Sequence, residues 1–542
     1  MKKLILLLLI FGALSINSKA QRYLQPTFPT ISVTTNAVYG FNYTVLAIPA
    51  IGHTLKQPLA MDVYQPSTDT LSARPLVIYV PTGNFLRKED RGSPTGDKSD
   101  SCAAEICTRL AKLGYVAAAA NYRLGWNPIG SLDVRNASLL QAAYRGIQDI
   151  RACVRFFKAN AATYKIDTNK IVVWGEGTGG YITLGMATLD NYNKILNTAQ
   201  PAGKFLIKNP DTTSANKLVP VVAVGVHSDI EGKTFTTVTA PYAGYGLPVG
   251  DTTNLVNSAA NSSKVSMVVN MGGALGDISW LDVNSTPIAT IHCPNDPNAP
   301  FTDLTLQVPI GPGLSLPVIQ VQGGYLVAAR ADSLGVNAAF SKLTPAYDPY
   351  KSLIVPRSAL DTRVAAAATL GTSVKYSTGL LPLVGQNTND AGPWSWWSKT
   401  DTLNNHQGNN PVTLANSPNM GRAKASLYID SIMIFALPRM CAVMNLPCKG
   451  VVTSTEDLLS ASATKLTVSP NPAISGMTFE SETFNPMHSI ELFDMSGRQM
   501  FQVNNINSAV YNLQRGGLPN GIYLAKVKFE GGILTKKVVF QN

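Results

Sequence analysis

Residues 171–180 read IVVWGEGTGG, an apolar run that leads into a glycine-rich turn. The run predicts a buried strand, and Gly175, Gly179 and Gly180 keep the glycines of the strand–turn–helix pattern G-x-S-x-G-G. In that pattern the turn exposes a serine nucleophile, but this chain has Gly177 at the serine position. Glycine has no side chain that could attack a substrate. The stretch therefore predicts a fold more clearly than it predicts an activity.

Strand and helix patterns alternate on both sides of this turn. Expected strands, which are short and apolar, lie at residues 75–80, 115–123, 170–174, 218–225, 265–271 and 287–292. Expected helices lie at residues 102–113, 139–164, 178–189 and 425–435. Apolar strands that alternate with helices are typical of a mostly parallel sheet covered on both faces. We therefore expect an α/β fold for the larger part of the chain.

Residues 1–20 have the pattern of a signal peptide. Lys2 and Lys3 precede an apolar run over residues 4–14, and small residues precede Gln21. The run is too short to span a bilayer, and we expect no other stretch with the ~20 apolar residues of a transmembrane helix. We therefore expect an exported chain.

Composition limits the partners and cofactors. The net charge is +11, but only 14% of residues are charged and no basic helix or stripe is present. We therefore expect no nucleic-acid partner. The chain has no EF-hand loop, H-E-x-x-H pattern or CxxC pair, so we expect no metal and no other cofactor. Export permits disulfides, and Cys441 and Cys448 are the expected pair, whereas Cys107 is expected to be a core thiol.

The composition changes near the carboxyl end. A linker rich in Ser and Thr covers residues 451–464, and short alternating segments separated by turn signals follow it. Several short strands at this spacing predict a small β-sandwich at residues 465–542. The main domain is expected at residues 21–450, with an irregular insertion at about residues 347–418.

Three segments resemble known families. Residues 121–180, which begin NYRLGW and end GEGTGG, resemble the secreted carboxylesterase and feruloyl-esterase-like branch of the α/β-hydrolase superfamily. Residues 287–301, PIATIHCPNDPNAPF, are similar to the strand and loop that carry the catalytic acid of that family, which puts Asp296 at the acid position.

The tail from residue 466, with VSPNP, IELFDMSGRQM and LPNGIYLAKV, resembles the type A sorting domain of the type IX secretion system. This resemblance implies a Bacteroidetes exporter as the partner. It also implies export through the periplasm and a secreted or cell-surface location.

An acyl hydrolase of this family needs a nucleophile, a histidine base, an acid and oxyanion donors. Thr178 is one position late for the nucleophile. The base is expected after the last core strand, placed near residues 337–343, yet no histidine follows there, so His406 in a later polar loop is the candidate. Gly83 and Asn84 in the stretch PTGNF, with the N–H of Thr178, could form an oxyanion-type nest or a plain turn.

Four tryptophans are candidate ligand platforms. Trp126, Trp394, Trp396 and Trp397 could stack on sugar rings or plant aromatics. The alternative is that they fix the insertion to the core by burial.

Two main hypotheses of function follow. The first is a non-catalytic or strongly impaired homologue, a pseudoenzyme that binds a ligand at the cell surface, because loss of the serine alone costs ~10⁶-fold in turnover of a triad enzyme. The alternative is an atypical hydrolase of carbohydrate-linked or small acyl esters with Asp296 retained. A purely structural surface protein is a third class.

Overall fold

The computed structural model describes residues 22–541, apart from residues 92, 209–216, 241, 243–245, 297, 312–313, 344–347, 351–353, 357–372, 376, 384–390, 398–401, 404–405, 408–419, 449–465, 482–485, 495–497 and 530–531. The expected signal peptide, the expected linker and much of the expected insertion lie outside the described residues. The chain divides into a first unit, Met1–Leu343 with Tyr350–Lys449, and a second unit, Thr344–Pro349 with Gly450–Asn542.

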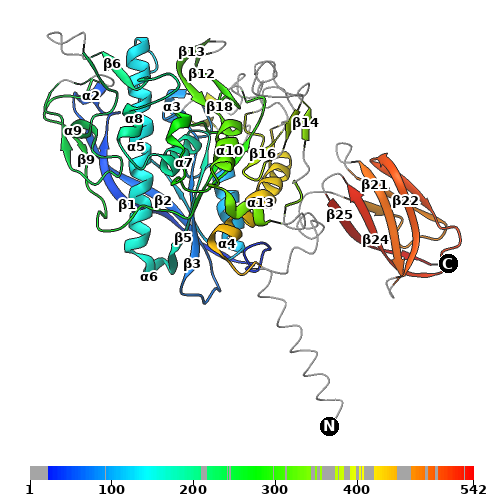
Figure 1. Cartoon of the computed structure of the whole chain (residues 1–542). Coiled ribbons are helices and arrows are strands. Elements are labelled where there is room, and N and C mark those ends of the chain that lie inside the picture. The colour runs from blue at the N-terminus through cyan, green and yellow to red at the C-terminus, as the bar shows by residue number, and fades with distance from the viewer. Residues whose placement is uncertain are drawn as a thin grey trace. The chain divides into compact units, whose positions relative to one another are not determined.

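An eight-stranded, mostly parallel sheet is the centre of the first unit (Figure 1), with the strand order β1-β2-β4-β3-β5-β10-β11-β16. The strands are β1 (Ile31–Thr44), β2 (Leu55–Pro66), β3 (Arg74–Val80), β4 (Val116–Ala120), β5 (Ile166–Glu176), β10 (Met267–Met271), β11 (Ile288–His292) and β16 (Leu380–Pro382). The pairs β1/β2 and β2/β4 are antiparallel, and the other pairs are parallel. The expected parallel α/β architecture is therefore present.

Five longer helices pack against this sheet. They are α4 (Ser101–Lys112), α5 (Leu132–Ala159), α7 (Thr178–Thr188), α10 (Gly324–Ser333) and α13 (Arg422–Met444). The helix α4 connects β3 to β4 in one direction along the sheet, whereas α5 and α7 connect strands in the other direction. Because such crossovers are right-handed, α4 lies on the opposite face of the sheet from α5 and α7. The ion pair between Arg109 and Asp430 joins α4 to α13.

Shorter elements connect these helices and strands. The short helices are α2 (Ile48–Ile51), α3 (Lys88–Arg91), α6 (Ala161–Tyr164), α8 (Asn193–Leu196), α9 (Val224–His227), η2 (Ile278–Trp280) and η3 (Ala338–Lys342). The short strand pairs are β6 (Leu206–Lys208) with β7 (Leu218–Pro220), β8 (Thr236–Thr237) with β9 (Thr252–Asn254), β12 (Asp303–Gly311) with β13 (Leu314–Gln322), β14 (Ile354–Pro356) with β15 (Ser373–Lys375), and β17 (Thr402–Leu403) with β18 (His406–Gln407).

Two expected core strands are wrong. The expected strand at residues 218–225 contains β7, which pairs with β6 outside the central sheet, and the start of the helix α9. Its apolar residues Val221 and Val222 are buried in the core cluster that includes α5, so their hydrophobicity reflects packing on a helix. The expected last strand near residues 337–343 is the 3₁₀-helix η3, and the last strand is β16, whose three residues are too few to show a period.

The helix α13 also departs from expectation. It has 23 residues and is long and apolar enough to cross a membrane, although no such stretch was expected beyond the leader. Of its most apolar window, 67% is buried inside the fold, as in the core helix of a packed domain. Cys441 near the end of α13 and Cys448 after it form the expected disulfide, while Cys107 is a buried free thiol.

The second unit is all-β. Its strands are β19 (Thr467–Ser469), β20 (Gly476–Glu480), β21 (Met487–Asp494), β22 (Gln499–Ser508), β23 (Val510–Gln514), β24 (Gly521–Phe529) and β25 (Gly532–Phe540). They form two antiparallel sheets, β19-β20-β23 and β22-β21-β24-β25. Alternate side chains such as Ile490, Leu492 and Val527 are buried in one core, as the alternating sequence predicts.

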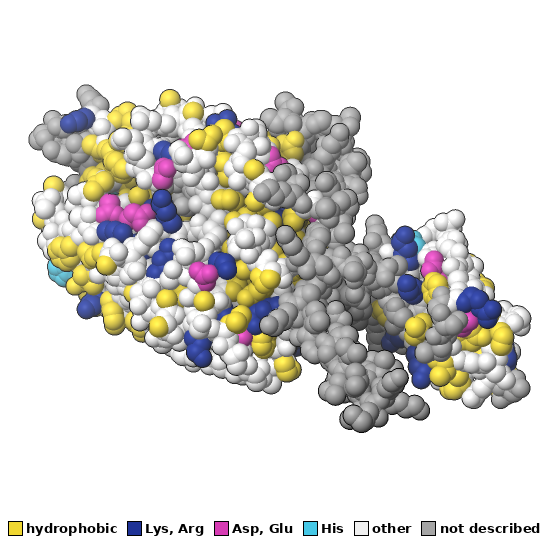
Figure 2. Space-filling view, turned by 60° about the horizontal axis from the view of Figure 1, so that its bottom comes forward, with side chains coloured by type: hydrophobic (Ala, Val, Ile, Leu, Met, Phe, Trp, Pro, Cys, Tyr) yellow, Lys and Arg dark blue, Asp and Glu magenta, His cyan; other side chains and the backbone are white. Residues whose placement is uncertain are grey.

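The described surface in Figure 2 carries charged side chains of both signs. On the face shown in Figure 2, Lys and Arg side chains are scattered among polar and apolar ones, and they form no continuous stripe there.

Candidate functional site

The turn after β5 has the predicted geometry. Gly177 is the N-cap of α7, with φ 53° and ψ −114°. Its N–H donates to the Met271 carbonyl oxygen at 2.7 Å, and its own carbonyl accepts from the N–H of Tyr181 at 3.2 Å. This φ favours glycine, and another residue is strained there. The chain therefore keeps the strained turn of a nucleophile elbow without the nucleophile.

Close packing explains why the flanking glycines are needed. A Cβ atom on Gly175 would lie 2.0 Å from the Gly179 carbonyl oxygen, and one on Gly179 would lie 2.0 Å from the carbonyl oxygen of Val80. Both neighbours are backbone atoms and cannot rotate away. The start of α7 thus approaches β3 and β5 more closely than any side chain permits.

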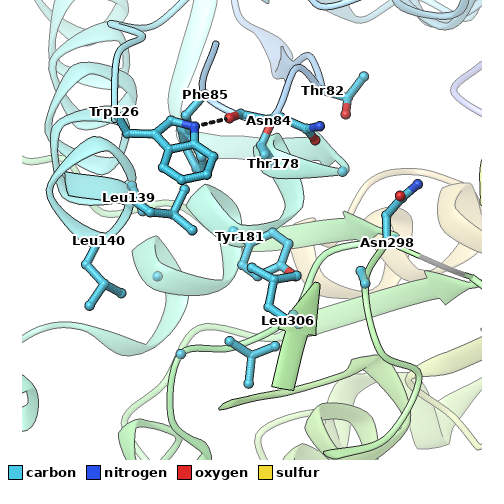
Figure 3. Close-up of a pocket in the computed structure, with 18 of the residues that line it drawn as sticks. Thr82, Asn84, Phe85, Trp126, Leu139, Leu140, Thr178, Tyr181, Asn298 and Leu306 are labelled. Atoms are coloured by element: carbon cyan, nitrogen blue, oxygen red, sulfur yellow. Dashed lines mark hydrogen bonds between the residues drawn. The ribbon is translucent and has the colours of Figure 1, made fainter. Parts of the chain in front are cut away.

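Thr82 occupies the space beside the elbow. A Cβ atom on Gly177 would lie 2.2 Å from the Thr82 Oγ1 and 2.9 Å from the Thr82 Cβ. The hydroxyl group of Thr82 therefore lies inside the volume that an elbow side chain would take. Thr82 follows β3 on the loop that carries Asn84, and Figure 3 shows both residues at the pocket.

The loop after β3 has the backbone of a donor nest. Gly83, Asn84 and Phe85 all have positive φ, at 145°, 50° and 54°. The indole N–H of Trp126 donates to the Asn84 carbonyl at 2.7 Å, which fixes that carbonyl (Figure 3). Within the described part of the chain, the backbone N–H groups of Gly83, Asn84 and Thr178 have no acceptor. Asn84 and Thr178 line the pocket described below, whereas Gly83 does not.

The Thr178 hydroxyl group is already engaged. Its Oγ1 lies 2.8 Å from the Tyr122 hydroxyl oxygen, and Tyr122 donates to the Pro81 carbonyl at 3.1 Å. Thr178 therefore donates its proton to Tyr122. This chain of hydrogen bonds ties the start of α7 to the loop after β3, which is a structural role.

Asp296 follows β11 and lines the pocket. Its Oδ1 accepts from the N–H groups of Asn298 at 2.7 Å and Ala299 at 3.0 Å, which fixes the turn. Its Oδ2 lies 3.8 Å from Nε2 of His292. Burial lowers the pKa of His292 to about 4, and its Nε2 lies 3.2 Å from the Ala299 carbonyl oxygen, so this ring is a neutral core histidine.

The described residues bring no histidine base to the elbow. The pocket lining that the structure describes contains no histidine. His406 lies in β18, and its side chain falls outside the described set. The hydroxyl group of Tyr181 is buried in the pocket wall and has no hydrogen-bond partner in the described chain. Burial, together with the charge of Asp296, raises the pKa of Tyr181.

Glu176, the residue before Gly177, is held from three sides. Its Oε1 accepts from the Trp394 indole N–H and the Ser395 hydroxyl, each at 2.8 Å, and its Oε2 accepts from the Tyr79 hydroxyl at 2.7 Å. Burial raises the pKa of Glu176. These bonds attach the segment after β16 to the elbow strand β5.

A cavity of about 620 Å³ lies over the elbow. Its wall is mostly apolar and includes Trp126, Leu139, Leu140, Tyr144, Phe205 and Trp280. Of the other predicted platforms, Trp394 and Trp397 line it, and Trp396 does not. The charged residues in the described lining are all acidic, namely Asp90, Glu176 and Asp296. Within the described chain, no group of three or more His, Cys, Asp or Glu residues could hold a metal ion.

Sequence reasoning missed three residues of this site. Thr82, Glu176 and Tyr181 all line the cavity, yet none was a candidate. Thr82 had a local signal, because it is a branched residue directly before the glycine of a predicted oxyanion turn.

Two segments of the chain match known protein families. Residues 61–303 match the BD-FAE family, and residues 467–541 match the secretion system C-terminal sorting domain. The chain is 30% identical over 120 residues to the bile salt-activated lipase of Homo sapiens, which is 22% of this chain and 15% of the lipase.

Two solved esterases are among the structures that this chain resembles. Thermogutta terrifontis esterase 2 phosphorylated by paraoxon is 15% identical, covers 51% of this chain and 74% of its own, and gives a TM-score of 0.28. A truncated carbohydrate esterase from gut microbiota is 16% identical, covers 51% of this chain and 81% of its own, and gives a TM-score of 0.27. Likenesses this weak carry no argument about the site.

The strand order, the elbow and the family match define the first unit as an α/β-hydrolase, as expected. More narrowly, it contains an esterase-like BD-FAE domain, and an all-β type IX sorting domain follows it. The sorting domain implies interaction with the type IX secretion machinery, and secretion or export to the cell surface.

Proposed function

We propose that the first unit is a binding domain with an esterase fold, which holds an ester or another neutral carbonyl compound and does not hydrolyse it by a serine mechanism. The observation that carries this proposal is the pair Gly177 and Thr82. The elbow has no side chain, and the Thr82 hydroxyl lies 2.2 Å from the point where a Cβ atom would stand.

The pocket supports a neutral ligand with an apolar body. The N–H groups of Asn84 and Thr178 are donors for a carbonyl oxygen, and the aromatic and aliphatic wall suits an apolar or aromatic group. An anion is disfavoured, because the described lining has acidic side chains and no Lys or Arg.

The alternative, an ester hydrolase with an unusual nucleophile, has less support. Thr178 is its candidate nucleophile, but the hydroxyl group of Thr178 is bonded to Tyr122. Asp296 is its candidate for activating a water molecule, because this carboxylate lines the pocket. His406 would be its base. A carbohydrate-linked ester is the substrate class that this alternative predicts.

The two functions are separated by one experiment on the purified full chain. We expect no release of p-nitrophenol from p-nitrophenyl butyrate above the rate of a Thr178→Val control, together with saturable binding of methyl benzoate by calorimetry. Turnover that disappears in Thr178→Val or His406→Ala would support the hydrolase. Turnover that survives both but disappears in Asp296→Asn would assign it to that carboxylate.

We further propose the domain limits 21–450, 451–464 and 465–542, a signal peptide at residues 1–20, and a route through the periplasm. A secretory leader and a carboxyl-terminal sorting domain together support two successive export steps.

A further inference from the structure

Thr82 has a hydroxyl group that the fold does not use. The side chain is half-buried and lines the cavity, and among the residues that the structure describes its Oγ1 has no hydrogen-bond partner. In the close-up of the pocket, Thr82 lies on the same loop as Asn84 (Figure 3). The group is thus available to a ligand.

The Thr82 hydroxyl group lies at the position that an elbow side chain would take. The distance of 2.2 Å between the Thr82 Oγ1 and the Cβ position of Gly177 is shorter than any nonbonded contact. The oxygen and an elbow side chain therefore compete for one volume. With glycine at the elbow, the oxygen of Thr82 occupies that volume, in the same cavity that Thr178 lines.

A second hydroxyl group supports a polar ligand at this end of the cavity. Tyr181 lies one turn along α7 from the elbow, and its buried hydroxyl has no partner within the described chain. Buried polar groups are rarely left without a partner, so the buried Tyr181 hydroxyl, together with the unpartnered hydroxyl of the half-buried Thr82, indicates a ligand with acceptor oxygens.

We propose that Thr82 and Gly177 are an exchanged pair, in which the Thr82 hydroxyl replaces the elbow side chain and donates a hydrogen bond to the carbonyl oxygen of the ligand. Thr82 is thereby a specificity-determining residue, since it favours a carbonyl compound over a hydrocarbon of the same shape. This inference rests on the proposed binding function.

The alternative is that Thr82 acts by bulk alone and fills the space left by the elbow side chain. Two substitutions separate the roles. Thr82→Val keeps the shape and removes the hydroxyl group, whereas Thr82→Ser keeps the hydroxyl group and removes the methyl group.

The test is isothermal titration calorimetry of the full chain with methyl benzoate and with ethylbenzene, which has a similar apolar ring and no carbonyl. We expect the ratio of the two affinities to fall roughly three- to tenfold in Thr82→Val, as for the loss of one neutral hydrogen bond. We expect Thr82→Ser to keep the wild-type ratio. If Thr82→Val does not fold, Thr82→Ala is compared with Thr82→Ser in its place.

The outcomes are distinct. If wild type binds no methyl benzoate, the proposed function itself fails. If wild type binds it but Thr82→Val keeps the same ratio, or loses both ligands equally, Thr82 acts by bulk and the inference is overturned while the binding function stands.

Discussion

Gly177→Ser restores the residue that the elbow pattern calls for, and we expect it to destabilise the protein. A residue with a side chain at φ 53° and ψ −114° is strained by about 1–3 kcal/mol. Its Cβ would overlap two atoms of Thr82, at 2.2 Å and 2.9 Å, and overpacking of this kind costs about 1–3 kcal/mol. The free energy of unfolding should therefore fall by about 2–6 kcal/mol.

The second substitution Thr82→Gly tests the steric part alone. It removes both overlapping atoms and leaves the Cα of residue 82 at 3.7 Å, an ordinary contact. We expect the double variant to be more stable than the sum of the two single effects by about 1–3 kcal/mol. The backbone strain at Gly177 is not relieved by this change.

Urea unfolding followed by tryptophan fluorescence measures this coupling in the full chain. All six tryptophans precede residue 398, in the first unit, so unfolding of the second unit gives no direct signal. Gly335→Ser is the matched control, because Gly335 also has a positive φ, 72°, but nothing lies within 4 Å of its Cβ position. A Gly177→Ser variant as stable as this control, or one that Thr82→Gly does not rescue, would refute the steric argument.

Three further predictions concern other parts of the chain. Burial raises the pKa of Glu176 above its ordinary value of 4.5, so the contribution of Glu176 to the free energy of unfolding is fully present below pH 4.5 and is lost as the pH rises through the folded-state pKa. Glu176→Gln should remove this decline from the urea midpoints measured between pH 4 and 9. An unchanged pH profile in this variant would contradict the prediction. Reduction of the Cys441–Cys448 disulfide, whose cysteines are seven residues apart, should lower the free energy of unfolding by about 2 kcal/mol, and Cys441→Ala with Cys448→Ala should make the protein insensitive to reductant. Deletion of residues 466–542 should leave the fluorescence-detected melting temperature unchanged and keep the protein in the periplasmic fraction on immunoblots; secretion of the shortened chain would count against the tail as the export signal.

Features with a local pattern were predictable from the sequence. The elbow turn at Gly177 could be located because its apolar strand and spaced glycines lie within ten residues. The same holds for the alternating strands of the second unit, where a period of two is visible in each segment. By contrast, the short last strand β16 offers three residues and no period.

Contacts between distant segments were not predictable. Thr82 lies beside Gly177 because β3 and β5 are neighbours and Val80 is paired with Gly175, a register that no local pattern reveals. The bond from Trp394 to Glu176 joins residues 218 positions apart. The contacts of Gly177 and Glu176 therefore depend on strand register and on hydrogen bonds between distant segments, which are defined only in the folded chain.

The pairing of Thr82 with Gly177 has a consequence for evolution. Glycine and serine codons can differ by one base, so a serine at the elbow is a short mutational step from this sequence. The overlap with Thr82 makes that step costly, and a change of Thr82 to glycine alone leaves both positions without a side chain. Selection on stability would therefore act against each single change, and the two residues would be inherited together.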